Sequence, residues 1–65
     1  MLSEHAVVFA KGKINEMINK GCIGVIVNVC DADVYLVEFF DSNMRTIDLY
    51  FVSKDQVEEV PNEVK

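Results

Sequence analysis

The sequence predicts a small all-β protein. Two runs rich in β-branched and aromatic residues, 23–30 and 34–40, are joined by the short polar turn 31–33, which is typical of a hairpin. Apolar residues alternate with a period of two through both runs, as they do in strands. Helical spacing occurs only at Ile14, Met17 and Ile18, which is one turn and too short to be stable alone.

The chain has 65 residues, which predicts one domain, 1–65, with its core within about 5–60. A chain of this size buries only about 60% of its unfolded surface, so its core must be dense. Because 51% of the residues are apolar, the composition is sufficient for such a core.

The first strand is expected at 6–10, and a long loop follows at 11–20. The apolar residues of that loop are expected to close one end of the fold. In the second strand, 23–30, Gly24 predicts a bend or a close backbone crossing. After the turn 31–33 and the third strand, 34–40, the chain is expected to form a turn at 41–44, a strand at 45–52, a short 3₁₀ turn at 53–56 and a last strand at 57–60. We expect Pro61 to end that strand and 62–65 to fray.

The alternation divides each strand into two faces. On the third strand, Tyr35, Val37 and Phe39 are expected to point into the core. We expect the other odd-numbered apolar residues of the second and fourth strands to do the same, namely Ile23, Val25, Val27, Val29, Ile47, Leu49 and Phe51. Five short antiparallel strands, with a long first loop and a 3₁₀ turn before the last strand, predict a small SH3-like barrel.

The order of the motifs resembles a family of small, mostly bacterial proteins of unknown function. The resemblance lies in 18–29 (Ile-Asn-Lys-Gly-Cys-Ile-Gly-Val-Ile-Val-Asn-Val), 35–39 (Tyr-Leu-Val-Glu-Phe), Thr46 and 55–57 (Asp-Gln-Val), and it covers about 5–60. It implies the SH3-like barrel and no particular activity. Cys22 stands where the family usually has Asp and Leu36 where it usually has Glu, and Phe40 adds a second large apolar residue beside Leu36.

No residue pattern predicts an enzyme, a cofactor site or a metal site. His5 is the only histidine, and the sequence places no catalytic partner near it. Asp31, Asp33 and Asp41 lack the ligand series of a calcium loop and are expected to stabilise turns. Cys22 and Cys30 would lie roughly 26 Å apart along one strand, too far for a disulfide. Both are expected to be reduced, although an intermolecular bridge stays open if either is exposed.

The first residues do not have the basic region and apolar core of a signal peptide, and no apolar run is long enough to cross a bilayer. A cytoplasmic protein is therefore expected, without membrane contact. The net charge of −5 argues against nucleic-acid binding, because four basic residues would have to overcome it: Lys11, Lys13, Lys20 and Arg45.

The leading functional hypothesis is a non-catalytic module that binds a protein partner, or a second copy of itself in a homodimer, through the outer face of the second to fourth strands. If the odd-numbered residues point inward, the outer face carries an apolar patch with an acidic rim, formed by Ile26, Leu36, Phe40, Asp48 and Tyr50. The alternative is an acidic inhibitor, antitoxin or immunity-type protein that covers a basic enzyme surface with Asp31, Asp33, Asp41, Asp48, Glu58 and Glu59.

Overall fold

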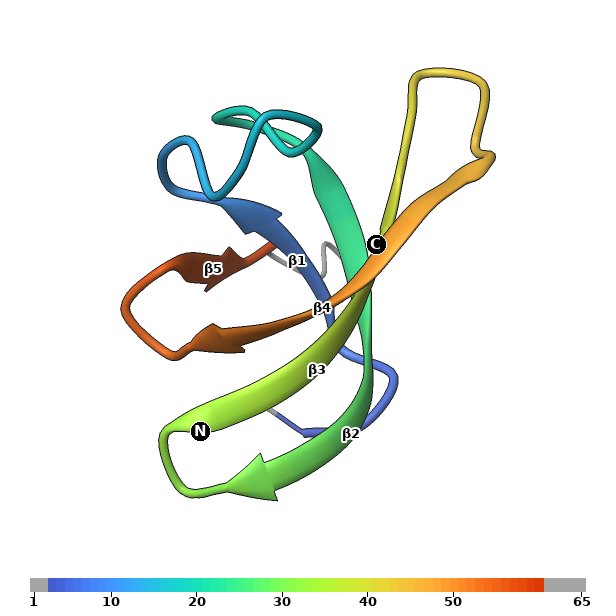
Figure 1. The fold of residues 1–65 in the computed structure, drawn as a ribbon. Helices are drawn as coiled ribbons and strands as arrows, with labels where there is room; N and C mark the ends of the chain where they lie inside the picture. The colour runs from blue at the N-terminus through green and yellow to red at the C-terminus, as the bar shows by residue number, and fades with distance from the viewer. Residues whose placement is uncertain (1–2, 61–65) are drawn as a thin grey trace.

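The structure is a computed structural model that describes residues 3–60. It confirms the all-β prediction, because one five-stranded antiparallel sheet contains all the regular secondary structure of these residues. The strands are β1 (Val7–Ala10), β2 (Ile23–Asp31), β3 (Val34–Phe40), β4 (Thr46–Ser53) and β5 (Val57–Glu59). Their order in the sheet is β4-β3-β2-β1-β5, so the chain meanders from β1 to β4 and β5 then returns to the free side of β1 (Figure 1).

The core lies on the inner side of the twisted sheet. Phe39 and Val37 of β3 are fully buried at its centre, beside Val8 of β1. Residues from all five strands and the first loop share this one cluster, so the sheet must curl around it. The remaining buried members are Ala10, Ile18, Ile26, Tyr35, Val52 and Val57.

The long loop between β1 and β2 closes one end of the core, as expected, but without a helical turn. Ile18 is fully buried and Ile14 packs against the core, whereas Met17 is exposed. The side chain of Asn15 explains the non-helical path, because its Oδ1 atom accepts the backbone N–H groups of Met17 and Ile18 at 2.8 and 2.9 Å. Such side-chain bonds compete with the backbone bonds of a helix.

The expectation that the odd-numbered residues of β2 point inward is wrong for Ile23, Val25 and Val27. Ile26 is fully buried and pairs with Val37, whereas Val25 pairs with Glu38 on the outer face. Beyond the irregular step at Val27, Val29 pairs with the buried Tyr35 and so lies on the inner face, although it is 38% exposed. The reason is Gly24, which is buried and faces the side chains of Val37 and Phe39. A Cβ atom at Gly24 would lie 2.5 Å from Cγ1 of Val37, so only glycine fits there. Ile26, two residues further along the strand, then also points inward.

The expected orientation of β4 is also wrong. Val52 is buried and pairs with Tyr35, while Leu49 and Phe51 are 53% and 62% exposed. The hairpin register is the cause, because it sets odd-numbered residues of β3 opposite even-numbered residues of β4. Next to the turn, the pairing shifts by one residue between the pairs Phe39–Asp48 and Phe40–Thr46.

The connection from β4 to β5 is a single turn, in which the Gln56 N–H donates to the Ser53 carbonyl at 3.0 Å. This bond has the three-residue spacing of a 3₁₀ turn. The expectations for Pro61 and for 62–65 lie outside the described residues. Within residues 3–60 there is no helix with the length and apolar character needed to cross a membrane.

Candidate functional site

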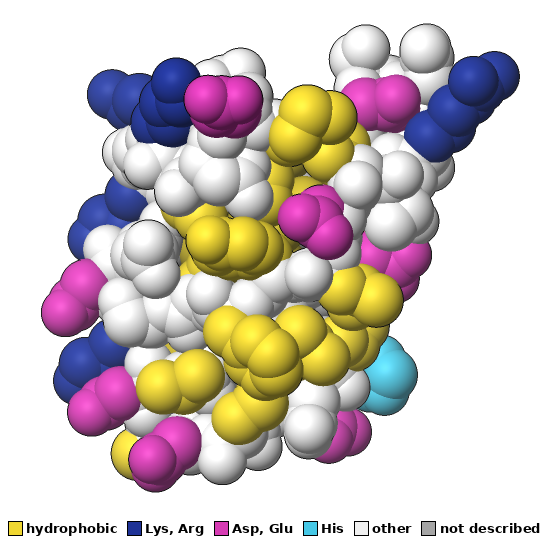
Figure 2. Space-filling view, viewed as in Figure 1, with side chains coloured by type: hydrophobic (Ala, Val, Ile, Leu, Met, Phe, Trp, Pro, Cys, Tyr) yellow, Lys and Arg dark blue, Asp and Glu magenta, His cyan; other side chains and the backbone are white. Residues whose placement is uncertain are grey.

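The outer face of β2, β3 and β4 carries a continuous set of apolar side chains, which we call the outer strip. Two cross-strand rows define it, because Val25 pairs with Glu38 and Glu38 with Leu49, while Leu36 pairs with Phe51. Figure 2 shows apolar side chains gathered over these strands rather than scattered singly. The outer strip consists of Ile23, Val25, Val27, Leu36, Phe40, Ile47, Leu49 and Phe51.

The most exposed members of the outer strip come from β4. Phe51 is 62% exposed and Leu49 is 53% exposed, although both are large apolar side chains on a regular strand. Val27 is exposed because it is the extra residue at an irregular step of β2, between the pairs Ile26–Val37 and Asn28–Leu36. Exposed apolar groups that adjoin one another on one face are typical of interaction surfaces.

One end of the outer strip is hollowed into a shallow groove of about 490 Å³. Its floor includes Ile23, Phe40 and Ile47, and its sides are the first loop and the β3–β4 turn. An exposed methionine stands on each side, Met17 at 64% and Met44 at 67% exposure. Methionine side chains adapt to partners of different shape, so this groove suits an apolar group on a protein partner.

The turn that carries Met44 is built by Asp41. Its Oδ1 atom accepts the backbone N–H groups of Asn43 at 2.8 Å and of Arg45 at 3.0 Å. The same turn places Met44 at φ 64°, a left-handed conformation that favours glycine. A large side chain is therefore held beside the groove at a conformational cost, which is common at functional sites.

The structure separates the residues predicted from the sequence to bind a partner. Leu36 and Phe40 lie on the outer strip, where both are half-buried. Ile26 lies in the core, so its expected place on the surface is wrong. Asp48 and Tyr50 are exposed, but they pair with Phe39 and Val37 and so lie on the opposite face of β4 from Leu36.

The sequence interpretation missed Leu49 and Phe51, the two most exposed members of the outer strip. Alternation along the fourth strand predicts both in the core, because it groups them with Ile47 as the more apolar set of that strand. Gly24 and the length of the β3–β4 turn were the available signals, since they set which residues of each strand share a face.

Cys22 lies in the groove, half-buried, and its Sγ atom donates to the Phe40 carbonyl at 3.3 Å. Burial raises the pKa of the Cys22 thiol above its ordinary value of 9.0, the bond to the Phe40 carbonyl lowers this pKa, and the charge of Asp41 raises it again. The net rise keeps the thiol protonated at neutral pH, so Cys22 is a poor nucleophile. Both cysteines are free, and Cys30 is exposed.

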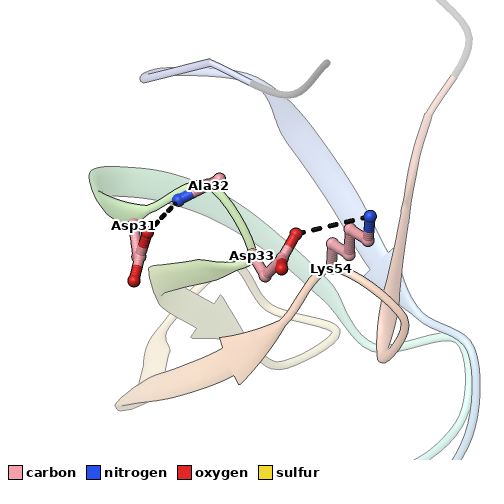
Figure 3. Close-up of polar contacts among 4 residues, drawn as sticks. All are labelled: Asp31, Ala32, Asp33 and Lys54. Atoms are coloured by element: carbon pink, nitrogen blue, oxygen red, sulfur yellow. Dashed lines mark hydrogen bonds and ion pairs between the residues drawn. The ribbon is translucent and has the colours of Figure 1, made fainter.

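Several acidic residues stabilise their own turns. The Asp31 side chain accepts the Ala32 N–H at 2.6 Å, and Asp33 forms an ion pair with Lys54 at 3.3 Å (Figure 3). Both partners of this ion pair are more than half exposed, so it adds little stability. Because Asp33 and Asp41 have these local roles, they are less suited to contact a separate basic target.

His5 is exposed, and the part of the chain that the structure describes places no group of three acidic, histidine or cysteine side chains where they could hold a metal ion. Lys11 and Lys13 line a second, smaller groove of about 300 Å³, where Asp55 offsets part of their charge.

Comparison with known proteins gives no relative from which a function could be transferred. No protein-family model matches the chain, and neither a curated protein nor a solved structure matches it. The resemblance to small bacterial proteins of unknown function therefore stays a prediction from the sequence.

Proposed function

We propose that this chain is a non-catalytic protein-binding module whose binding surface is the outer strip. The observation that supports the proposal most strongly is the exposure of Leu49 and Phe51 on the face of the sheet that also carries Leu36. The core is complete without these side chains, because other residues of the five strands and the first loop already fill the inner side of the sheet. A soluble domain that leaves such adjoining side chains in water gains from covering them.

The proposed binding mode places apolar anchors of the partner on Leu49 and Phe51 and in the groove beside Phe40. Large aromatic side chains at the centre of an interface commonly contribute most of the binding energy. Glu38 lies between Val25 and Leu49 in one of the two rows, and its carboxylate accepts a hydrogen bond from the Thr46 hydroxyl. A donor on the partner that meets this carboxylate would fix the orientation of the complex.

The test compares aromatic neighbours on opposite faces of the same strand. Phe51→Ser removes an anchor of the outer strip, whereas Tyr50→Ser removes an exposed aromatic ring from the other face. Leu36→Glu is the third variant, because it adds a charge at the centre of the outer strip without altering the edge strand. Each variant is first checked for the wild-type far-ultraviolet circular dichroism spectrum.

The readout is capture of proteins from a native lysate. We expect Phe51→Ser and Leu36→Glu to lose most of the captured protein, and Tyr50→Ser to retain it. Equal behaviour of all three variants and the wild type would overturn the proposal. Capture that disappears at high salt but is unaffected by Phe51→Ser would instead favour the acidic inhibitor.

A further inference from the structure

Within residues 3–60, strand β4 forms one edge of the sheet and has β3 as its only sheet neighbour. Its eight residues read Thr-Ile-Asp-Leu-Tyr-Phe-Val-Ser, with no proline, lysine or glycine. Proteins commonly protect edge strands with lysine, proline or a covering segment, because an open edge can pair with another strand. Asp48 is the only charged residue of β4, and the residues from Asp48 to Phe51 are all exposed.

The hydrogen bonds at the end of β4 show which backbone groups face this open edge. The Lys54 N–H donates to the Asp33 carbonyl of the β2–β3 turn at 2.9 Å. Because backbone groups alternate in direction along an antiparallel strand, those of Val52, Tyr50 and Asp48 also face β3. The N–H and C=O groups of Leu49, Phe51 and Ser53 therefore face away from β3.

Of these three residues, Ser53 already has partners. Its N–H donates to Oε1 of Gln56 at 2.8 Å, and its carbonyl accepts the Gln56 N–H at 3.0 Å. Gln56 thus caps one end of the edge. The open part is centred on Leu49 and Phe51, the same residues whose side chains are the most exposed of the outer strip.

We propose that β4 pairs antiparallel with β4 of a second copy of this chain, with the twofold axis at Leu49. In this register, Leu49 lies opposite the partner's Leu49, and Ile47 lies opposite the partner's Phe51, so apolar groups meet on the outer face. On the other face, Asp48 lies opposite the partner's Tyr50, whose hydroxyl can donate to the carboxylate. The two sheets would join into one, and the two outer strips would become one surface.

Other symmetric registers match the side chains less well. An axis at Asp48 would set two carboxylates opposite each other, which is unfavourable. An axis at Tyr50 would set Asp48 opposite the partner's Val52, a residue whose side chain is buried. Of these three axes, only the axis at Leu49 pairs apolar with apolar residues and the carboxylate with a hydrogen-bond donor.

Charge gives a signature that distinguishes a second copy from a basic partner. Each chain has a net charge of −5, so two copies repel each other at long range. Salt screens this repulsion, with a Debye length of about 8 Å at physiological ionic strength. Added salt should therefore strengthen the pairing of two copies, whereas it would weaken the binding of a basic protein.

The test is disulfide trapping in a Cys22→Ser, Cys30→Ser background. In the proposed register, position 48 lies opposite the partner's position 50, with Cα atoms about 4.5 Å apart. We expect a mixture of Asp48→Cys chains and Tyr50→Cys chains to form a mixed disulfide dimer on mild oxidation. Either variant alone should form no disulfide-linked dimer, because its own cysteines would be roughly 8 Å apart, beyond the reach of a disulfide.

Equal cross-linking of the mixture and the single variants would overturn the register, and no cross-linking of the mixture would overturn the pairing. A second measurement uses Leu49→Pro, which removes an N–H that faces the open edge, and Leu49→Ala, which keeps it. We expect the sedimentation mass of the Pro variant to fall from twice 7.4 kDa to 7.4 kDa, and that of the Ala variant to stay above the monomer value.

This inference rests on the proposed function, because it names the partner of a binding module, but the two can fail separately. Leu36→Glu changes the outer strip on β3 and leaves the edge of β4 intact. If Leu36→Glu chains still form the mixed disulfide but capture no protein through the outer strip, edge pairing alone would be supported. Loss of pairing in Leu49→Pro, with capture of another protein retained, would support the outer strip as a separate site.

Discussion

The substitution of Gly24 by alanine tests the packing that fixes the inner face of β2. A Cβ atom at this position would lie 2.5 Å from Cγ1 of Val37, 3.0 Å from the Glu38 carbonyl oxygen and 3.0 Å from Cδ1 of Phe39. Ordinary contacts between carbon atoms are about 3.5–4.0 Å, so the closest of these is too short by about 1 Å. The neighbours cannot move aside easily, because Val37 and Phe39 are fully buried and the third group is backbone.

The expected loss of stability follows from these contacts. Forcing one additional methyl group into a filled core costs about 1–3 kcal/mol, and the three short contacts place Gly24→Ala near the upper end. Alanine recovers about 0.5–1 kcal/mol, because it loses less backbone freedom on folding than glycine does. The net destabilisation is therefore about 2 kcal/mol. A domain of this size has a total stability of about 3–10 kcal/mol, so the change is large.

The assay is urea unfolding followed by far-ultraviolet circular dichroism, since the chain contains no tryptophan. Thermal unfolding should show a fall in Tm of about 8–16 °C, at about 4–8 °C per kcal/mol. The other two glycines provide matched controls. Gly12 has no atom within 4 Å of an added Cβ, so Gly12→Ala should be neutral or stabilise by about 0.4–1 kcal/mol.

Gly21 separates strain from crowding. An added Cβ there has open space, but φ is +89°, so Gly21→Ala should destabilise by about 1 kcal/mol through the backbone alone. The expected order of stability is Gly12→Ala, then Gly21→Ala, then Gly24→Ala. If Gly24→Ala unfolds within about 0.5 kcal/mol of the wild type, the inward orientation of Gly24, and with it that of Ile26, would be refuted.

Four further predictions follow from the loops and the groove. Met44→Gly should raise the free energy of unfolding by about 1 kcal/mol in urea, because it relieves the left-handed φ of 64°, and no gain would show that the strain is absent. Ile18→Ala should lower it by about 2–4 kcal/mol, since Ile18 is fully buried at the end of the core; a loss below about 1 kcal/mol would mean that the first loop is not docked. Cys22 should react with a maleimide more slowly than exposed Cys30 at neutral pH, with the sites resolved by peptide mass spectrometry, and equal rates would contradict the protection of Cys22. Because the pKa of Cys22 is raised in the folded state, the contribution of the protonated thiol to stability is complete below about pH 9 and is lost as the pH rises further. Urea unfolding at alkaline pH should therefore show a loss of stability in the wild type that is absent in Cys22→Ser.

The strands themselves could be predicted from the sequence because their signals are local. The third strand has the predicted bounds, three others differ by one residue at one end, and the fourth strand differs by one residue at both ends. Alternation in 34–40 also assigned Tyr35, Val37 and Phe39 correctly to the core. Here the pattern was unambiguous, because Glu38 marks the opposite, less buried face.

The faces of β2 and β4 could not be assigned by alternation alone. In 23–30 both sets of residues are largely apolar, so the pattern leaves open which set is inside. In 46–52 the more apolar set, with Leu49 and Phe51, lies outside. That outcome depends on the register of the β3–β4 hairpin, which is set by the turn at Asp41 and the irregular step beside Phe40.

The two errors of orientation lead to the same functional argument. A residue too small to fill space, Gly24, occupies the inner face of β2, while Phe51 and Leu49 remain in solvent on the outer face. Folding alone would favour the reverse, because burying a Leu or Phe side chain contributes about 1.5–3 kcal/mol. Since the core is filled without them, these side chains gain that energy only when another surface covers them. The residues that alternation wrongly assigned to the core are therefore the ones best suited to bind a partner.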